Sequence, residues 1–271
     1  MEAMSLLPVG LGLLVGVLLG LTGAGGGILA VPLLVFGLGM TVADAGPVAL
    51  LAVAMAAAFG AVLGLKDKVL RYKAAAVMSA AGILLSPLGL WVAGMIPNRP
   101  LAGIFGVVLV YVSTTMYLKA HRELSGVIVT DDGMGPPCLL DTTRGKLTWT
   151  LRCFRTMLAS GALMGFLSGL LGVGGGFVIV PALKKTTNLP MKAIVATSMG
   201  VITLVSLGGV IGATIKGVLA WSIAAPFALG AVVGMLMSRP LAQKISGPRL
   251  QQTFAIFAFM VALSMIAKAV I

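Results

Sequence analysis

Several stretches of this chain run for about 20 residues or more without a charged side chain, which is the length that crosses the hydrocarbon core of a bilayer. Ala45–Leu65 and Ala193–Ile215 are two of them. Of all 271 residues, 59% are hydrophobic and 10% are charged. A soluble domain carries about 25% charged residues, so these stretches are too long and too numerous for a soluble core. We therefore predict an all-α integral membrane protein.

The chain contains an internal repeat. Residues 20–34 read GLTGAGGGILAVPLL and residues 169–183 read GLLGVGGGFVIVPAL, with nine of the fifteen positions identical at an offset of 149 residues. A constant offset over most of a chain indicates two homologous halves. We predict a first transmembrane repeat at 1–120, a linker at 121–150 and a second repeat at 151–271. The same offset aligns Gly16 with Gly165, Gly60 with Gly209, Leu70 with Leu219, and Phe105 with Phe254.

Each half begins with a long apolar stretch that glycines interrupt, Leu6–Gly39 in the first half and Met157–Leu183 in the second. At about 1.5 Å per residue, Leu6–Thr22 and Ile28–Gly39 form helices of about 25 Å and about 18 Å, too long together for one crossing. We therefore predict a re-entrant helical hairpin in each half, followed by three transmembrane helices. The predicted spans are Ala45–Leu65, Ala74–Met95 and Leu101–Leu118, then Ala193–Ile215, Val218–Ser238 and Leu250–Ala267.

The distribution of basic residues predicts how the two halves are oriented. Lys and Arg concentrate on the cytoplasmic side of membrane proteins. If the halves are inverted, 16 of the 19 basic residues lie inside, whereas parallel halves leave 12 inside and 7 outside. We therefore predict two inverted repeats with both termini outside the cytoplasm and the linker 121–150 within it. The net charge of +12 arises from these loops and does not indicate a nucleic-acid partner.

The repeated glycine motif predicts a binding site for an anion. Glycine permits positive φ and lets a ligand approach the backbone, and a helix that starts after the loop directs unpaired N–H groups at the ligand. Broken helices that face each other across a repeat interface form the substrate sites of many secondary transporters. Close helix packing is the alternative use of such glycines. The candidate substrate-binding residues are Thr22, Gly23, Gly25, Gly26, Gly27, Gly172, Gly174, Gly175, Gly176, Thr197 and Ser198.

Other residues bear on the mechanism. Pro32 and Pro181 each follow the last glycine of their motif with four residues in between, and they are expected to kink or end the short helices. Asp44 is the one acid close to a span. Two roles stay open for this residue, proton coupling and the N-cap of a helix. Thr197 and Ser198 could also bond back to their own helix.

The sequence offers no constellation for catalysis or for a cofactor. His121 is the single histidine, and no phosphate-binding loop with a following lysine is present. Cys138 and Cys153 lack the spacing of metal ligands, and we interpret them as two reduced thiols. We therefore expect neither an enzyme, nor a metal site, nor a cofactor.

The paired GLTGAGGG…P and GLLGVGGG…P motifs, with the element Ala196-Thr197-Ser198 and two Leu-x-aromatic turns, resemble the sulfite exporter TauE/SafE family of membrane transporters. The resemblance implies transport of a small sulfur-containing anion, such as sulfite, thiosulfate or an organosulfonate, in a bacterial cell membrane. The first half departs from the pattern, because with a shift of one residue Gly46-Pro47-Val48 stands where the second half has Ala-Thr-Ser. We therefore expect the second half to supply more of the polar contacts.

Together these features predict a secondary transporter, and an exporter in particular, that works by alternating access around the paired glycine loops. Its partners are a small anionic substrate and the lipid bilayer of the inner membrane, and assembly into a homo-oligomer stays open. An anion channel of the same architecture is one alternative. A non-transporting membrane assembly or receptor protein, with the linker as its working part, is the other.

Overall fold

The computed structural model describes residues 2–23, 26–125, 138, 140–141, 146–147, 150–242 and 247–270. These residues are almost entirely helical, and the predicted all-α membrane architecture is confirmed. The first half contains α1 (Glu2–Thr22), the short 3₁₀ helix η1 (Gly26–Leu29), α2 (Ala30–Gly37), α3 (Val42–Lys66), α4 (Tyr72–Met95) and α5 (Asn98–Leu124). The second half contains α6 (Leu151–Leu171), α7 (Gly176–Thr186), α8 (Met191–Ile215), α9 (Trp221–Ala242) and α10 (Gly247–Val270).

Within the described ranges, 7 helices are long and apolar enough to cross a membrane, namely α3, α4, α5, α6, α8, α9 and α10. Six of them are the predicted plain spans. The seventh, α6, differs from the expectation of two short arms in the second hairpin. It begins at Leu151 rather than near Met157, because the Thr150 hydroxyl accepts a hydrogen bond from the N–H of Cys153 and caps the helix there. The second hairpin therefore has one arm of 21 residues and one of 11 residues.

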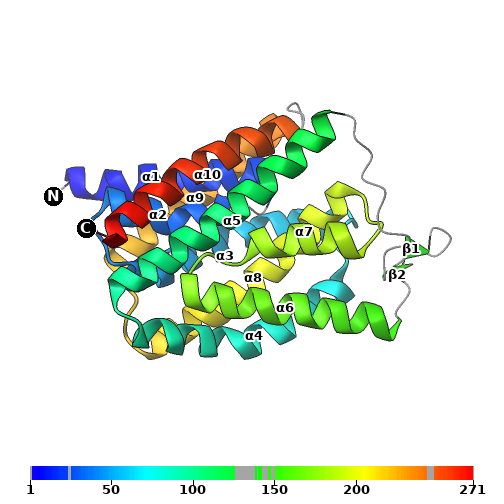
Figure 1. Ribbon diagram of the computed structural model, residues 1–271, viewed down its shortest axis with the longest axis horizontal. Helices are drawn as coiled ribbons and strands as arrows, with labels where there is room; N and C mark the ends of the chain where they lie inside the picture. Colours follow the sequence, from blue (N-terminus) through cyan, green and yellow to red (C-terminus); the bar gives the residue numbers. More distant parts are fainter. Residues whose placement is uncertain are drawn as a thin grey trace.

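The two central helices are α3 and α8, which pack against each other. In each of them 61% of the most apolar window is buried, compared with 28% in the peripheral helix α10. Around this pair, α1 packs on α9, α4 on α6 and α5 on α10 (Figure 1). The two chain termini lie at one end of the molecule, and the strands of the linker lie at the other end.

Glycines allow the closest of these helix pairs to form. A β-carbon on Gly16 of α1 would overlap the backbone of Ala231 in α9, and one on Gly165 of α6 would overlap the backbone of Gly82 in α4. Small residues that let two helix backbones approach are typical of membrane helix pairs. The packing glycines recur every four residues in both halves, as Gly12, Gly16 and Gly20 in α1 and Gly161, Gly165 and Gly169 in α6.

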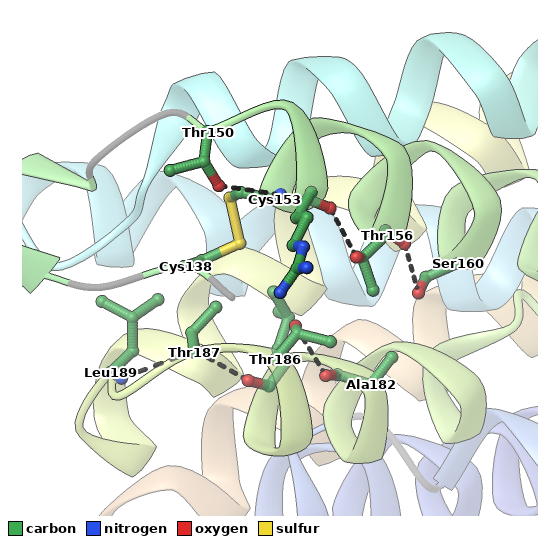
Figure 2. The surroundings of a disulfide bond; sticks show 11 residues. Cys138, Thr150, Cys153, Thr156, Ser160, Ala182, Thr186, Thr187 and Leu189 are labelled. Carbon is green, nitrogen blue, oxygen red and sulfur yellow. Dashed lines mark hydrogen bonds between the residues drawn. A yellow bond between two sulfur atoms is a disulfide. The ribbon is translucent and has the colours of Figure 1, made fainter. Parts of the chain in front are cut away.

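A disulfide bond joins the linker to α6, which corrects the prediction of two reduced thiols. Cys138 and Cys153 are joined with their Cα atoms 5.0 Å apart (Figure 2). The N–H of Cys138 donates to the carbonyl of Thr186 at the end of α7, and this contact holds Cys138 beside the start of α6. The spacing of 15 residues does not reveal the bond, because it depends on how the linker folds back. A small antiparallel ribbon, β1 (Leu140–Asp141) with β2 (Lys146–Leu147), lies between the two cysteines.

Candidate functional site at the glycine loops

The second glycine loop joins α6 to α7 and has a backbone that only glycine adopts readily. Gly172, Gly174 and Gly175 have φ angles of 69°, 68° and 64°, in the left-handed region. Helix α7 begins at Gly176, so the turn delivers the positive end of its dipole to the loop. Within the described residues, the N–H groups of Val173, Gly174 and Gly175 have no hydrogen-bond partner. The loop thus presents buried donors, which an anion could accept.

The first glycine loop is built differently. Gly23 has a φ of 78°, but Gly26 and Gly27 lie in the 3₁₀ helix that leads into α2. The Thr22 hydroxyl donates to the carbonyl of Leu18 at 2.7 Å and accepts from the N–H of Gly26 at 3.1 Å. This threonine therefore closes the first loop with its own hydroxyl. Gly25, the remaining glycine predicted for this loop, lies outside the described residues.

The structure brings the two loops together. A β-carbon built on Gly27 would lie 3.0 Å from the carbonyl oxygen of Val173 in the second loop. Both Gly27 and Gly174 face the side chain of Val53 in α3, and Gly174 also faces Ser206 in α8. The loops from opposite halves therefore meet against the two most buried helices.

Thr197 and Ser198, the predicted polar contacts on α8, have partners within the protein. The hydroxyl of Thr197 accepts a hydrogen bond from the backbone N–H of Arg71 at 3.0 Å, and it ties α8 to the turn before α4. The hydroxyl of Ser198 donates to the carbonyl of Val195 in its own helix at 2.8 Å. Both residues are buried. Their role in substrate binding stays a prediction.

The remaining candidates occupy helix starts and interiors. Helices α2 and α7 continue past Pro32 and Pro181, so neither proline ends its helix, and a kink at either stays a prediction. The N-cap of α3 is Thr41 rather than Asp44. The Thr41 hydroxyl donates to the Asp44 carboxylate at 2.6 Å and accepts from the Asp44 N–H at 3.2 Å. Asp44 therefore supports the cap from within the first turn.

Two cavities approach the second loop from different sides. The larger, about 500 Å³, reaches from Lys119 and Lys184 down to Thr22, Gly176 and Phe177. The smaller, about 160 Å³, reaches from Asp44 and Lys216 to Gly172. Lys119 and Lys184 belong to the ends of α5 and α7 that lie toward the linker, whereas Asp44 and Lys216 belong to the opposite ends of α3 and α8. The second loop therefore contributes Gly176 to the lining of one cavity and Gly172 to the lining of the other.

Three buried serines near this loop escaped the sequence analysis. Within the described residues, the hydroxyls of Ser86, Ser168 and Ser206 have no hydrogen-bond partner. They are not related by the repeat offset, and serine in a helix normally bonds to its own backbone. No sequence signal therefore sets them apart.

Comparison with known proteins gives a consistent result. A sequence model of the family described as "Sulfite exporter TauE/SafE" matches residues 9–265. The chain is 29% identical to the probable membrane transporter protein YunE of Bacillus subtilis over 248 residues, which covers 87% of each chain. It is 30% identical over 218 residues to a probable membrane transporter protein of Methanocaldococcus jannaschii, which covers 78% of this chain and 73% of the relative.

A third relative is matched over almost its full length. A probable membrane transporter protein of Xylella fastidiosa is 27% identical over 271 aligned positions, which cover 96% of this chain and 94% of the relative. No solved structure matches the chain.

Proposed function

Because the chain belongs to the sulfite exporter TauE/SafE family, we propose that it is a secondary transporter that exports a small sulfur-containing anion across the cell membrane. Sulfite, thiosulfate and an organosulfonate are the candidate substrates. One observation supports this proposal above the others. Two glycine loops from opposite halves meet against α3 and α8, and the second loop carries unpaired N–H groups at the start of a helix.

The chemical groups where the two glycine loops meet favour an anion as the ligand. Unpaired N–H groups and the positive end of a helix dipole attract negative charge, and burial strengthens that attraction because little water screens it. No charged side chain is among the described atoms nearest the loop glycines. The loop itself offers hydrogen-bond donors, which favour a negatively charged ligand.

The contacts between helices support a structural repeat. The most extensive helix pairs each have an equivalent pair when the elements of one half are replaced by their counterparts in the other half. The pair α1–α9 has its counterpart in α6–α4, and α2–α3 has its counterpart in α7–α8. The pairs α3–α8 and α5–α10 are their own counterparts. An ion pair of 3.8 Å between Asp67 and Lys192 places the turn after α3 beside the turn before α8. Inverted halves require these two turns at the same face, whereas parallel halves require them at opposite faces.

The two cavities support alternating access. The larger is lined by Lys119 and Lys184 together with Gly176, and the smaller by Asp44 and Lys216 together with Gly172, so each cavity touches one end of the second loop. A rocking motion of one half against the other would widen one cavity while it closes the other. The anion would then exchange sides without an open pore.

Transport of radiolabelled sulfite in proteoliposomes tests the proposal. We expect uptake that saturates with concentration and accelerates when unlabelled sulfite is trapped inside, with thiosulfate, sulfoacetate, sulfate and chloride as competitors. Flux that rises linearly and shows no counter-exchange would instead identify a channel. Absence of flux for every anion, in protein that is folded and inserted, would contradict transport and favour an assembly or receptor role for the linker.

A further inference from the structure

Three buried serines differ from the other hydroxyl residues of the spans. The hydroxyls of Ser79, Ser198 and Ser238 each donate to a carbonyl of the preceding helical turn. The hydroxyls of Ser86, Ser168 and Ser206 have no partner among the described residues, although each of these side chains is at most 1% exposed. A buried hydroxyl without a partner costs free energy, so its persistence points to a ligand that completes it.

Ser206 lies directly against the second glycine loop. Its Oγ atom is 3.1 Å from the position that a β-carbon on Gly174 would occupy. The unpaired N–H groups of Val173, Gly174 and Gly175 belong to the same loop. A hydroxyl donor and backbone donors therefore gather at the start of α7, a helix of 11 residues.

Ser86 on α4 and Ser168 on α6 are connected to this part of the molecule through helix contacts. The Oγ atom of Ser86 is 3.6 Å from the β-carbon position of Gly209, which is one turn along α8 from Ser206. Ser168 is in the last turn of α6, and its carbonyl accepts the N–H of Gly172 at 2.9 Å. The adjacent residue Gly169 packs on the backbone of Ser86. Helices α4, α6 and α8 thus each bring one partnerless hydroxyl to the region of the loop.

The serine region borders the smaller cavity. Leu50 and Gly169 line that cavity. The same Leu50 faces Gly209 beside Ser86, and Gly169 follows Ser168 in the chain. Ser86 and Ser168 are therefore next to residues that line this cavity.

We propose that Ser86, Ser168 and Ser206, with the N–H groups of the second glycine loop, bind a small singly charged oxyanion. This inference rests on the proposed transport function and names the site within it. The hydroxyls donate to the oxygen atoms of the anion, and the start of α7 stabilises its charge.

The groups that form the site determine which charge of the bound anion it prefers. The cost of moving an ion out of water rises with the square of its charge. Hydrogen-bond donors and a helix dipole must offset that cost here, since no charged side-chain atom is among the nearest contacts of the loop glycines. Such a site suits a monoanion, such as hydrogen sulfite, better than a dianion such as sulfate. Sulfate should therefore compete at least about tenfold more weakly than hydrogen sulfite.

Counterflow of sulfite in proteoliposomes, measured over a range of concentrations at pH 6, tests the site. We expect Ser206→Ala to raise KM about tenfold, the equivalent of about 1.4 kcal/mol, because a hydrogen bond to a charged group is lost. Ser86→Ala and Ser168→Ala should raise KM in the same direction. Ser79→Ala is the matched control, since Ser79 is equally buried on α4 but donates to the carbonyl of Ala75. It should leave KM unchanged.

The outcomes separate this site from the transport proposal. Wild-type counterflow with an unchanged KM in all three serine variants would overturn the serine site and leave transport intact. Competition by sulfate as strong as that by hydrogen sulfite would overturn the preference for a monoanion. Binding of sulfite to detergent-purified protein, followed as a rise in Tm that Ser206→Ala removes and Ser79→Ala retains, supports the site without relying on flux.

Discussion

At Gly165, helix α6 lies so close to α4 that a single added carbon has no room. A β-carbon there would overlap backbone atoms of Gly82, which cannot move aside as a flexible side chain can. The same position in the first half, Gly16, meets the backbone of α9. Many glycines of this chain therefore serve helix packing, and the loop glycines with positive φ are a separate set.

Substitution of Gly165 tests this distinction. We expect Gly165→Val to destabilise the protein by about 1–3 kcal/mol or more, because the larger side chain forces α6 away from α4. Gly94→Ala, in the partner helix α4, should have little effect, since nothing lies within 4 Å of the added carbon. Thermal unfolding in detergent measures both variants. Equal Tm values for Gly165→Val and wild type would show that the two helices are not packed as described.

Individual site residues were harder to predict than the motifs that contain them. The doubled motif locates both loops, because positive φ and close approach demand glycine. It does not reveal that Thr197 accepts from Arg71, a residue 126 positions away, because such a contact depends on the tertiary fold. Ser206 escaped for the same reason. Its missing partner is a property of the packed structure and leaves no trace in the sequence.

Among the elements, the plain spans could be predicted closely from gaps between charges. The predicted span Ala74–Met95 corresponds to α4 at Tyr72–Met95, and Ala193–Ile215 corresponds to α8 at Met191–Ile215. The second hairpin was predicted less well, because basic residues near Arg152 hide the start of α6 when charge gaps define the ends. A capping threonine, rather than hydropathy, sets that boundary.

The disulfide attaches the linker to the second hairpin, and its removal should lower the stability of the protein. We expect the double variant Cys138→Ser with Cys153→Ser to be less stable by about 3 kcal/mol, the estimate for a closed loop of about 15 residues. Counterflow should be retained, because the bond lies at the start of α6 and away from the glycine loops. Thermal unfolding and flux of oxidised protein check both statements. Loss of flux at full stability would give the linker a direct part in transport.

For the molecule as a whole, the orientation in the membrane is defined by the side on which the linker lies. Two features of the chain bear on that side. The basic residues near Lys66 and Lys185 indicate the cytoplasm, on the same end as the linker. A disulfide between Cys138 and Cys153 indicates an oxidising compartment, since such bonds are rare in the cytoplasm. A cytoplasmic linker stays a prediction, and it rests on the charges, because 16 of 19 basic residues share that side in the inverted arrangement.

In the proposed inverted arrangement of the two halves, the glycine loops converge from opposite directions, and labelling tests this arrangement most directly. In a chain whose native cysteines are replaced by serine, single cysteines at Lys66, Lys185 and Arg99 are treated in intact cells with a thiol reagent that does not cross the membrane. We expect reaction at Arg99→Cys alone, with Lys66→Cys and Lys185→Cys reacting only after the cells are opened. Reaction of Lys66→Cys and Lys185→Cys from opposite faces of the membrane would contradict the inverted arrangement and the site built on it.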